Sequence, residues 1–353
     1  MRTYPITTFS GPIEVRETQT PEPRGTEVLL RVTRAGVCHS DLHIWEGFYD
    51  LGGGNKLQLG DRGIELPLTM GHEIFGEIAK VGPDAGNLPL GAPRLVYPWL
   101  GCRECPTCKA GRENHCAKPR SLGVFLDGGY AEYCLVPHPE YLVDIGDLDP
   151  TVATPYACSG VTVYSAIKKA LPIEAGEWLA IMGGGGLGLN AVAIASALGV
   201  ENIVSCEIDD AKLAAARTLG AKATVNTRSP GALEELQAIT GGGPRAAVDT
   251  VGAEATASLA IASLLKGGRY VIVGLFGGSL SLPLPTLPLR AISILGSYVG
   301  NLSELKELIE LVKTSKVMPI PVTTRPLCEV GAALEDLRNG KILGRVVLTT
   351  ADS

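Results

Sequence analysis

The sequence predicts an α/β protein in which a doubly wound parallel sheet is inserted into a β-rich domain. In the middle of the chain, strand and helix patterns alternate, and a glycine-rich turn joins the first strand to the first helix. Before that region, short and partly alternating apolar segments are separated by glycine and proline. A last apolar segment at 345–349 again has a strand pattern. We therefore expect the chain to begin one domain, cross into a second and return to the first.

The middle region contains six strand patterns, and helical patterns separate the first five of them. Asp210 is expected to cap a helix, and Gly199 and Gly220 are expected to end helices. Three prolines at 283–288 exclude a regular helix from the last connection. Strands are expected at 178–182, 202–206, 223–226, 246–251, 269–273 and 292–297, and helices near 161–169, 187–198, 210–219, 231–239, 254–265 and 303–313.

A run of glycines follows the first strand of this region. Gly183, Gly185 and Gly188 have the G-x-G-x-x-G spacing, which permits a tight turn and a close approach of backbone N–H groups to a pyrophosphate. Glu207 ends the next strand, where a carboxylate would bind the adenosine ribose hydroxyls. The order of strand, turn, helix and acid indicates a dinucleotide site. The alternative is an ordinary loop of an α/β domain.

Composition limits the possible classes of function. The chain has 353 residues, of which 45% are hydrophobic and 19% charged, and its net charge is −6. These values are typical of a globular protein with room for two domains, and the negative charge argues against nucleic acid or an anionic membrane as the main partner. No apolar run reaches membrane-spanning length, and the N-terminus lacks the apolar core of a signal peptide. We expect a cytoplasmic protein.

Four of the nine cysteines lie within fifteen residues, at Cys102, Cys105, Cys108 and Cys116. Short C-x2-C steps allow a loop to direct several thiolates at one ion, and four thiolates form a closed tetrahedral zinc site. Such a site has no open position, so its role would be structural. An iron–sulfur cluster also uses four cysteines, and four unrelated buried thiols are the remaining alternative.

A second set of possible metal ligands is dispersed along the chain: Cys38, His72 and Cys158. Each residue is weak evidence for a metal when taken alone. A single cysteine is usually a small core residue, and a single histidine more often has a structural hydrogen bond than a metal. Their significance depends on the motifs around them.

These motifs resemble those of the zinc-dependent medium-chain alcohol dehydrogenases, over nearly the whole chain and in the expected order. The resemblance is closest to the microbial tetrameric members, because the long insertion of the dimeric animal and plant enzymes is missing. The matching segments are Ala-Gly-Val-Cys-His-Ser-Asp-Leu-His at 35–43, Gly-His-Glu at 71–73, the four-cysteine segment, Cys-Ser-Gly-Val-Thr-Val-Tyr at 158–164, the glycine turn at 183–188 and Gly-Arg-Val at 344–346.

The resemblance implies a Rossmann NAD-binding domain at 158–298 inserted in a GroES-like catalytic domain at 1–157 and 299–353. It also implies reversible hydride transfer between NAD and a primary or secondary alcohol, aliphatic or aromatic, and two zinc ions per chain. The partners would be a small alcohol, aldehyde or ketone, and other copies of the chain in a homotetramer.

The same resemblance assigns Cys38, His72 and Cys158 to a catalytic zinc. Asp41 would orient His72. Glu73 resembles a zinc-proximal glutamate that either ligates the metal transiently or remains a nearby carboxylate.

A proton relay is implied by two further residues of the first motif. Ser40 resembles the hydroxyl that takes the proton from the alcohol, and His43 resembles the base that delivers it to solvent. The alternative for Ser40 is a helix cap.

The predicted cofactor contacts surround the glycine turn. Glu207 is followed by further acids and by no nearby arginine, so NAD rather than NADP is expected. His39 and Arg345 resemble contacts to the pyrophosphate. The full set of expected cofactor-binding residues is His39, Gly183, Gly185, Gly186, Leu187, Gly188, Glu207, Val251, Val273, Gly274 and Arg345.

The substrate pocket is the least defined part of the expected site. Trp99 resembles its aromatic wall, and Tyr298, Phe125 and Trp45 are further candidates, although each of them could be ordinary core or interface. An apolar pocket beside a zinc ion suits alcohols with aliphatic or aromatic tails.

Three other functions fit parts of the sequence. The first is a specialised zinc dehydrogenase for a polyol, threonine or an aldehyde, and the lack of extra acids around the pocket argues against a polyol. The second is a non-enzymatic zinc- and nucleotide-binding structural protein, which would have no use for an open zinc site. The third is a zinc-independent quinone-type reductase, against which the three dispersed ligands argue.

Overall fold

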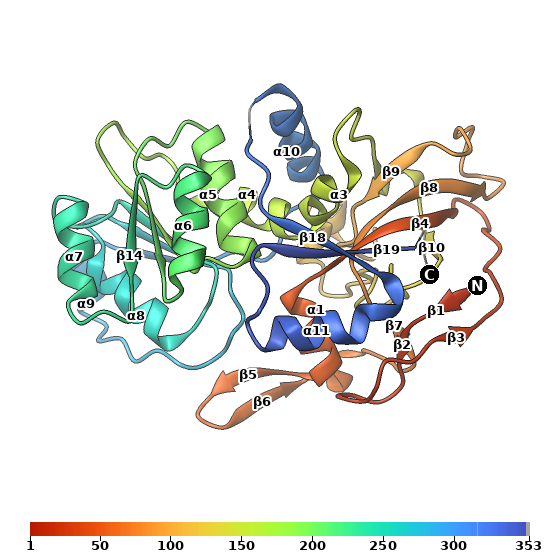
Figure 1. The fold of residues 1–353 in the computed structure, drawn as a ribbon, viewed down its shortest axis with the longest axis horizontal. Helices are drawn as coiled ribbons and strands as arrows, with labels where there is room; N and C mark the ends of the chain where they lie inside the picture. The colour runs from red at the N-terminus through yellow and green to blue at the C-terminus, as the bar shows by residue number, and fades with distance from the viewer. Residues whose placement is uncertain (316, 351–353) are drawn as a thin grey trace.

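The computed structural model describes residues 1–315 and 317–350, and its two large sheets lie side by side (Figure 1). One is a parallel six-stranded sheet in the order β14-β13-β12-β15-β16-β17. Its strand order reverses between β12 and β15, and such a switch point is where open α/β sheets bind ligands. The strands are β12 (Leu179–Met182), β13 (Ile203–Glu207), β14 (Ala223–Asn226), β15 (Ala246–Asp249), β16 (Arg269–Ile272) and β17 (Ser293–Gly296). The predicted doubly wound sheet is confirmed.

Helices connect these strands at the predicted places. Gly199 and Gly220 follow the ends of two of them with φ of +87° and +115°, a conformation that glycine adopts without strain. The helices are α5 (Gly186–Ala197), α6 (Asp210–Thr218), α7 (Ala232–Ile239) and α8 (Glu254–Ser263), with α10 (Leu302–Thr314) after the sheet.

Two local predictions were wrong. The carboxylate of Asp209, not of Asp210, accepts hydrogen bonds from the first backbone N–H groups of α6 and caps this helix. The connection from β16 to β17 contains the short helix α9 (Thr286–Arg290). Pro288 is tolerated there because it is the third helical residue, where a backbone N–H has no acceptor within the helix.

The second sheet is built around β4 (Val28–Val37), which pairs with three other strands. One of them is β19 (Arg345–Thr349), so the end of the chain returns to the N-terminal sheet, as the blue and red strands show in Figure 1. The remaining strands of this sheet are β8 (Glu73–Val81), β9 (Pro93–Val96), β10 (Tyr133–Val136), β11 (Leu142–Val143) and β18 (Val322–Pro326). The domain boundaries stay predictions.

Shorter elements complete the chain. Small paired strands are β1 (Arg2–Thr3) with β3 (Arg16–Glu17), β2 (Pro5–Ile6) with β7 (Leu68–Thr69), and β5 (Phe48–Gly52) with β6 (Asn55–Gln58). The further helices are α1 (His39–Glu46), α2 (Pro106–Lys109), α3 (Pro150–Ala153), α4 (Ser159–Ala170) and α11 (Val330–Arg338), and 3₁₀ turns lie at Gly60–Arg62, Glu113–His115, Pro139–Tyr141, Thr154–Ala157 and Leu327–Glu329. In residues 1–315 and 317–350, no helix is long and apolar enough to cross a membrane.

Helix α4 connects the two parts of the core. It is buried along almost its whole length, and it packs against α5, β15 and β16 of the parallel sheet and against α10. Its first residue follows Cys158. One of the candidate metal ligands therefore lies where the two sheets meet.

Candidate active site

A cavity of about 430 Å³ lies at the carboxyl ends of β12 and β13, and residues of both sheets line it. This is the place that the strand order indicates for a ligand. Most of the residues predicted for the catalytic zinc, the proton relay and the cofactor meet there, and the remaining three of these, His72, Glu73 and Gly188, are buried. The predicted residues in the lining are Cys38, His39, Ser40, His43, Trp99, Cys158, Gly183, Gly185, Gly186, Leu187, Glu207, Val251, Val273, Gly274, Tyr298 and Arg345.

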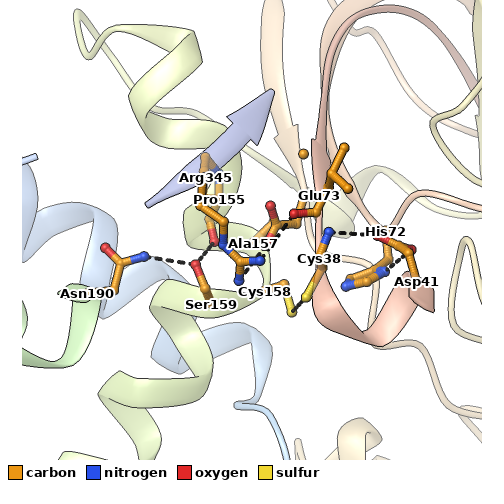
Figure 2. Close-up of polar contacts among 12 residues, drawn as sticks. Cys38, Asp41, His72, Glu73, Pro155, Ala157, Cys158, Ser159, Asn190 and Arg345 are labelled. Atoms are coloured by element: carbon orange, nitrogen blue, oxygen red, sulfur yellow. Dashed lines mark hydrogen bonds and ion pairs between the residues drawn. The ribbon is translucent and has the colours of Figure 1, made fainter. Parts of the chain in front are cut away.

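Three candidate metal ligands converge at one end of this cavity. Cys38 precedes α1, His72 precedes β8 and Cys158 precedes α4, and the three donor atoms lie within 4.8 Å of one another. Figure 2 shows the sulfur atoms of Cys38 and Cys158 next to each other, and they are 3.8 Å apart. Zinc–sulfur bonds of about 2.3 Å in a tetrahedral site place two sulfurs about 3.8 Å apart. The donor set therefore fits a single zinc ion.

The ring of His72 is oriented by a buried carboxylate (Figure 2). Its Nδ1 atom lies 3.0 Å from Oδ1 of Asp41, and both side chains are inaccessible to solvent. Burial opposes a charge on the ring, but the neighbouring Asp41 raises the pKa of His72 well above its usual value. Within the described chain, Nε2 has no hydrogen-bond partner, so this nitrogen is available to an ion.

The start of α4 holds Cys158 in place. The hydroxyl of Ser159 donates a hydrogen bond to the carbonyl of Pro155 at 3.0 Å, and it accepts one from Asn190 of α5 at 2.8 Å. Figure 2 shows this chain of contacts beside the two sulfurs. The helix that begins at the glycine turn is thereby connected to the residue next to a metal ligand.

A buried ion pair lies next to Cys38. Nη2 of Arg345 is 3.4 Å from Oε1 of Glu73, and Nη1 donates to the carbonyl of Val37 at 3.2 Å. Burial raises the pKa of Glu73 to about 8, and the positive charge of Arg345 opposes this rise. Gly36 leaves room for the carboxylate, because a Cβ there would lie 2.0 Å from Oε2 of Glu73.

The four clustered cysteines also converge. Their sulfurs lie within 4.8 Å of one another, and three of the sulfur pairs are 3.5–3.9 Å apart, as expected for the edges of one zinc tetrahedron. Backbone N–H groups of Cys102, Cys108 and Lys118 point at these sulfurs and would stabilise thiolates. An iron–sulfur cluster holds several irons and would spread its thiolates further apart, so the geometry favours a single ion.

The glycine turn has the geometry that its spacing predicts. Gly183 has φ of +96°, and a Cβ on Gly188 would lie 1.9 Å from the carbonyl oxygen of Gly183. A Cβ on Gly186 would lie 2.8 Å from Nε of Arg345. Glu207 lies opposite the turn, where its carboxylate accepts a hydrogen bond from the N–H of Gly184 at 2.5 Å.

The two relay candidates both line the cavity. Helix α1 is capped by Cys38, with the carboxylate of Asp41 accepting from the Cys38 N–H, so the alternative role of Ser40 as a cap is excluded. The ring of His43 packs against Tyr49 with centroids 4.9 Å apart. Burial lowers the pKa of His43 to about 4, so this imidazole is neutral at pH 7.

Two of the four substrate-pocket candidates reach the cavity. The Trp99 ring lies 5.2 Å from the His72 ring and 6.3 Å from the Tyr298 ring, measured between centroids. Its indole N–H donates to the carbonyl of Ala157 at 3.0 Å, which fixes the ring beside the metal ligands.

The other two candidates are placed elsewhere. The indole N–H of Trp45 donates to the carbonyl of Gly11, and Arg338 covers the ring at 4.3 Å. Phe125 packs against the core, and its neighbour Val124 lines the cavity instead. A side chain's direction within a loop or helix depends on tertiary packing, which residue type alone did not reveal.

Thr162, Tyr49 and Lys212 are among the lining residues that were not predicted from the sequence. Thr162 lies one helical turn after Cys158, and its buried Oγ1 has no hydrogen-bond partner among the described residues. The spacing from Cys158 was the available signal, because residues four apart share a helix face. Lys212 lies beside Gly184 near Glu207, and only the packing of α6 on the turn places it there.

Comparisons with known proteins agree with this geometry. The Alcohol dehydrogenase GroES-like domain matches residues 24–147, and the Zinc-binding dehydrogenase family matches residues 186–314. An NAD-dependent alcohol dehydrogenase of Sulfurisphaera tokodaii is 38% identical over 99% of both chains. The chain belongs to the zinc-dependent medium-chain alcohol dehydrogenase family. The predicted membership and the predicted fold class are confirmed.

Solved structures of the family have the same fold over the whole chain. The alcohol dehydrogenase of the archaeon Aeropyrum pernix has a TM-score of 0.90 and 31% identity, over 99% of this chain and 100% of that chain. The D-arabinose dehydrogenase of Sulfolobus solfataricus has a TM-score of 0.83 and 29% identity, over 99% and 98%. Family membership and the two donor sets together support NAD and two zinc ions as the cofactors.

Proposed function

We propose that this chain is an NAD-dependent alcohol dehydrogenase that interconverts a primary or secondary alcohol, aliphatic or aromatic, with its aldehyde or ketone. One observation carries the proposal: a donor set for zinc and a dinucleotide-binding turn open into the same cavity. A structural zinc-binding protein would have no use for this combination.

The residues divide into two metal sites. Cys38, His72 and Cys158 hold the catalytic zinc, and Asp41 orients the imidazole. When bound, this zinc supplies Lewis-acid chemistry that favours loss of the alcohol proton, and NAD accepts the hydride. Glu73 remains beside the site, held by its ion pair with Arg345. The structural zinc is held by Cys102, Cys105, Cys108 and Cys116.

Ser40 and His43 conduct the proton. Both line the cavity, one helical turn apart on α1, and the lowered pKa of His43 keeps its imidazole neutral at physiological pH. We assign the Ser40 hydroxyl to accept the substrate proton and pass its own to His43. The imidazole then releases a proton to solvent from its position near the cavity wall.

The cofactor lies along the glycine turn in this proposal. Backbone N–H groups at the start of α5 and the guanidinium of Arg345 would face the pyrophosphate, and His39, which also lines the cavity, would contact it. The carboxylate of Glu207 binds the ribose hydroxyls and repels a 2′-phosphate, which selects NAD. The remaining contacts are assigned to Gly183, Gly185, Gly186, Leu187, Gly188, Val251, Val273 and Gly274.

The substrate end of the cavity favours an alcohol without further polar groups. Trp99 and Tyr298 form an aromatic wall beside the ligands, and Val124 adds apolar surface. Among the described residues that line the cavity, Glu207 is the only carboxylate, and it lies at the cofactor end. A polyol or sugar would be recognised by several hydrogen-bonding groups near the zinc, so the simpler alcohol fits better.

We further propose that the protein is a cytoplasmic homotetramer. None of the nine cysteines forms a disulfide in the described structure, as expected in a reducing compartment. The edge strand β17 leaves one side of the parallel sheet unpaired, and the apolar side chains of Ile294 on this strand and of Leu284 and Leu289 in the segment before it are exposed. An exposed edge of this kind suits a second copy of the chain. Light scattering after size-exclusion chromatography measures the number of chains.

The function is tested by mixing the zinc-loaded protein with NAD and a panel of primary, secondary and benzylic alcohols, and by following the absorbance of reduced cofactor. We expect turnover with several members, no turnover with polyols of similar size, and loss of turnover after treatment with a chelator. Absence of turnover with zinc and NAD both bound would contradict the proposed function.

A further inference from the structure

Tyr130 is buried beside the catalytic ligands but outside the lining of the cavity. Its side chain is inaccessible to solvent, and its segment runs beside the segment that precedes His72. The Tyr130 N–H donates to the carbonyl of Met70 at 3.0 Å, and the Gly129 N–H donates to the carbonyl of Gly71 at 2.7 Å. The backbone therefore fixes the position of Tyr130 relative to His72.

The tyrosine hydroxyl is directed at Asp41. It donates a hydrogen bond to Oδ2 of Asp41 at 2.9 Å and lies 3.3 Å from the carbonyl oxygen of Gly36. The same Oδ2 accepts the N–H of Cys38 at 2.9 Å, while Oδ1 lies 3.0 Å from Nδ1 of His72. One carboxylate is thus held by three groups, and two of these belong to metal ligands.

The tyrosine ring also restricts the backbone next to His72. Gly71 has φ of +88°, and a Cβ at this position would lie 2.5 Å from Cδ1 of Tyr130. The ring therefore occupies the space beside the Gly71–His72 peptide. Ring and hydroxyl together contact both the backbone that carries His72 and the carboxylate that orients its imidazole.

We infer that Tyr130 is a positioning residue for the catalytic zinc, acting through Asp41 on His72 and Cys38. Removing a partner from a fully buried carboxylate leaves that group under-satisfied and free to turn. The loss of a group that hydrogen-bonds directly to a metal ligand lowers metal affinity by about 10-fold to 100-fold. Tyr130 stands one contact further out, so we expect the lower end of this range. This inference rests on the proposed assignment of Cys38, His72 and Cys158.

The test compares the rate at which zinc leaves each site in Tyr130→Phe and in wild-type protein. A colorimetric chelator in excess reports the release, and the phase that is missing in Cys158→Ser identifies the catalytic site. We expect the catalytic zinc to leave Tyr130→Phe about tenfold faster and the zinc of the four-cysteine segment to leave at an unchanged rate. An unchanged catalytic phase in a folded Tyr130→Phe would overturn the inference.

Tyr97→Phe is the matched control. Tyr97 is equally buried, and its hydroxyl donates to the carbonyl of Gly300 at 2.8 Å, away from Asp41. Its variant should lose similar stability but release both zinc ions at wild-type rates. If both variants accelerate the catalytic phase equally, the effect is one of general stability and the inference is wrong.

A double variant tests the route through Asp41. In the Asp41→Ala background the carboxylate that accepts the Tyr130 hydroxyl is already absent. Tyr130→Phe then leaves no buried carboxylate under-satisfied, so the double variant should fold even if Tyr130→Phe alone does not. We expect the second substitution to leave the release rate within about twofold of Asp41→Ala. A further tenfold acceleration would show that Tyr130 does not act through Asp41.

Wild-type protein with a single release phase would instead contradict the ligand assignment itself.

Discussion

The guanidinium of Arg345, on the last strand, lies 3.4 Å from the carboxylate of Glu73, next to a zinc ligand, and at most 6% of either side chain is exposed. This contact joins β8, in the N-terminal part of the chain, to β19, its last strand. Arg345 also lies against Gly186, at the start of the helix that we propose faces the pyrophosphate. One cation therefore serves a buried carboxylate and the cofactor site together.

Replacing Arg345 with methionine should lower both stability and NAD affinity. Above the pKa of Glu73, about 8, where this group is ionised, a buried carboxylate left without its partner costs about 3 kcal/mol of unfolding free energy. We expect a loss of this order in urea unfolding and a roughly tenfold weaker NAD affinity by calorimetry. Arg338→Met is the control, because Arg338 lies 3.5 Å from Glu46 on a partly exposed surface and should cost less than about 1 kcal/mol. Equal losses in the two variants would show that the buried pair has no special role.

Glu207→Gln should relax the choice of cofactor. The amide keeps an oxygen that accepts the Gly184 N–H, but it removes the charge that repels a 2′-phosphate. The nearby Lys212 would then attract that phosphate. We expect the ratio of kcat/KM for NAD to that for NADP to fall by about tenfold or more, which corresponds to ~1.4 kcal/mol. Glu201→Gln changes an exposed acid outside the cavity and should leave the ratio unchanged.

His43→Gln should slow alcohol oxidation. Glutamine preserves much of the side-chain volume but cannot accept and release a proton near neutral pH. We expect kcat for oxidation at pH 7 to fall by about tenfold, since proton transfer by a positioned side chain contributes at least this much. A variant with the wild-type rate would remove His43 from the relay.

The same variant changes how stability depends on pH. The folded pKa of His43, about 4, lies below the value of about 6.5 for an unfolded histidine. Between these values the unfolded chain binds a proton that the folded chain does not, so His43 lowers stability as pH falls through this window. Relative to wild type, His43→Gln should gain about 2 kcal/mol of unfolding free energy on going from pH 7 to pH 5. A constant difference would mean that this imidazole is not desolvated.

The four-cysteine segment should contribute stability and no chemistry. Cys105→Ser removes one of four thiolates, so we expect the loss of one zinc ion per chain and a Tm lower by about 5 °C. NAD affinity should be unchanged. Cys328→Ser, at an exposed cysteine outside both metal sites, should keep both zinc ions and the wild-type Tm. Loss of both zinc ions in Cys105→Ser would show that the two sites depend on each other.

Much of the site could be predicted because many of its residues belong to short sequence motifs. The glycine spacing and the acid at the end of the second strand follow from backbone geometry, and Cys38, His72 and Cys158 gained meaning from their flanking residues. The structure brings these three donors together from distant positions in the chain.

The predictions that failed depended on tertiary packing. Trp45 and Phe125 were plausible wall residues by type, but packing turns Trp45 toward Gly11 and brings Val124 to the cavity instead.

Tyr130 gave only a strand pattern in the sequence. Its contact with Asp41 exists because the 128–130 segment runs beside the residues before His72.

We propose that Cys38, His72 and Cys158 hold a second zinc ion, at a site that opens into the cofactor cavity. The most direct test counts zinc per chain by atomic spectrometry in wild type, in Cys158→Ser and in Cys134→Ser. Cys134 is a buried thiol outside both metal sites and serves as the control. We predict two zinc ions in wild type and in Cys134→Ser, and one in Cys158→Ser, which should still bind NAD. One zinc in wild type, or two that persist in Cys158→Ser, would contradict the assignment.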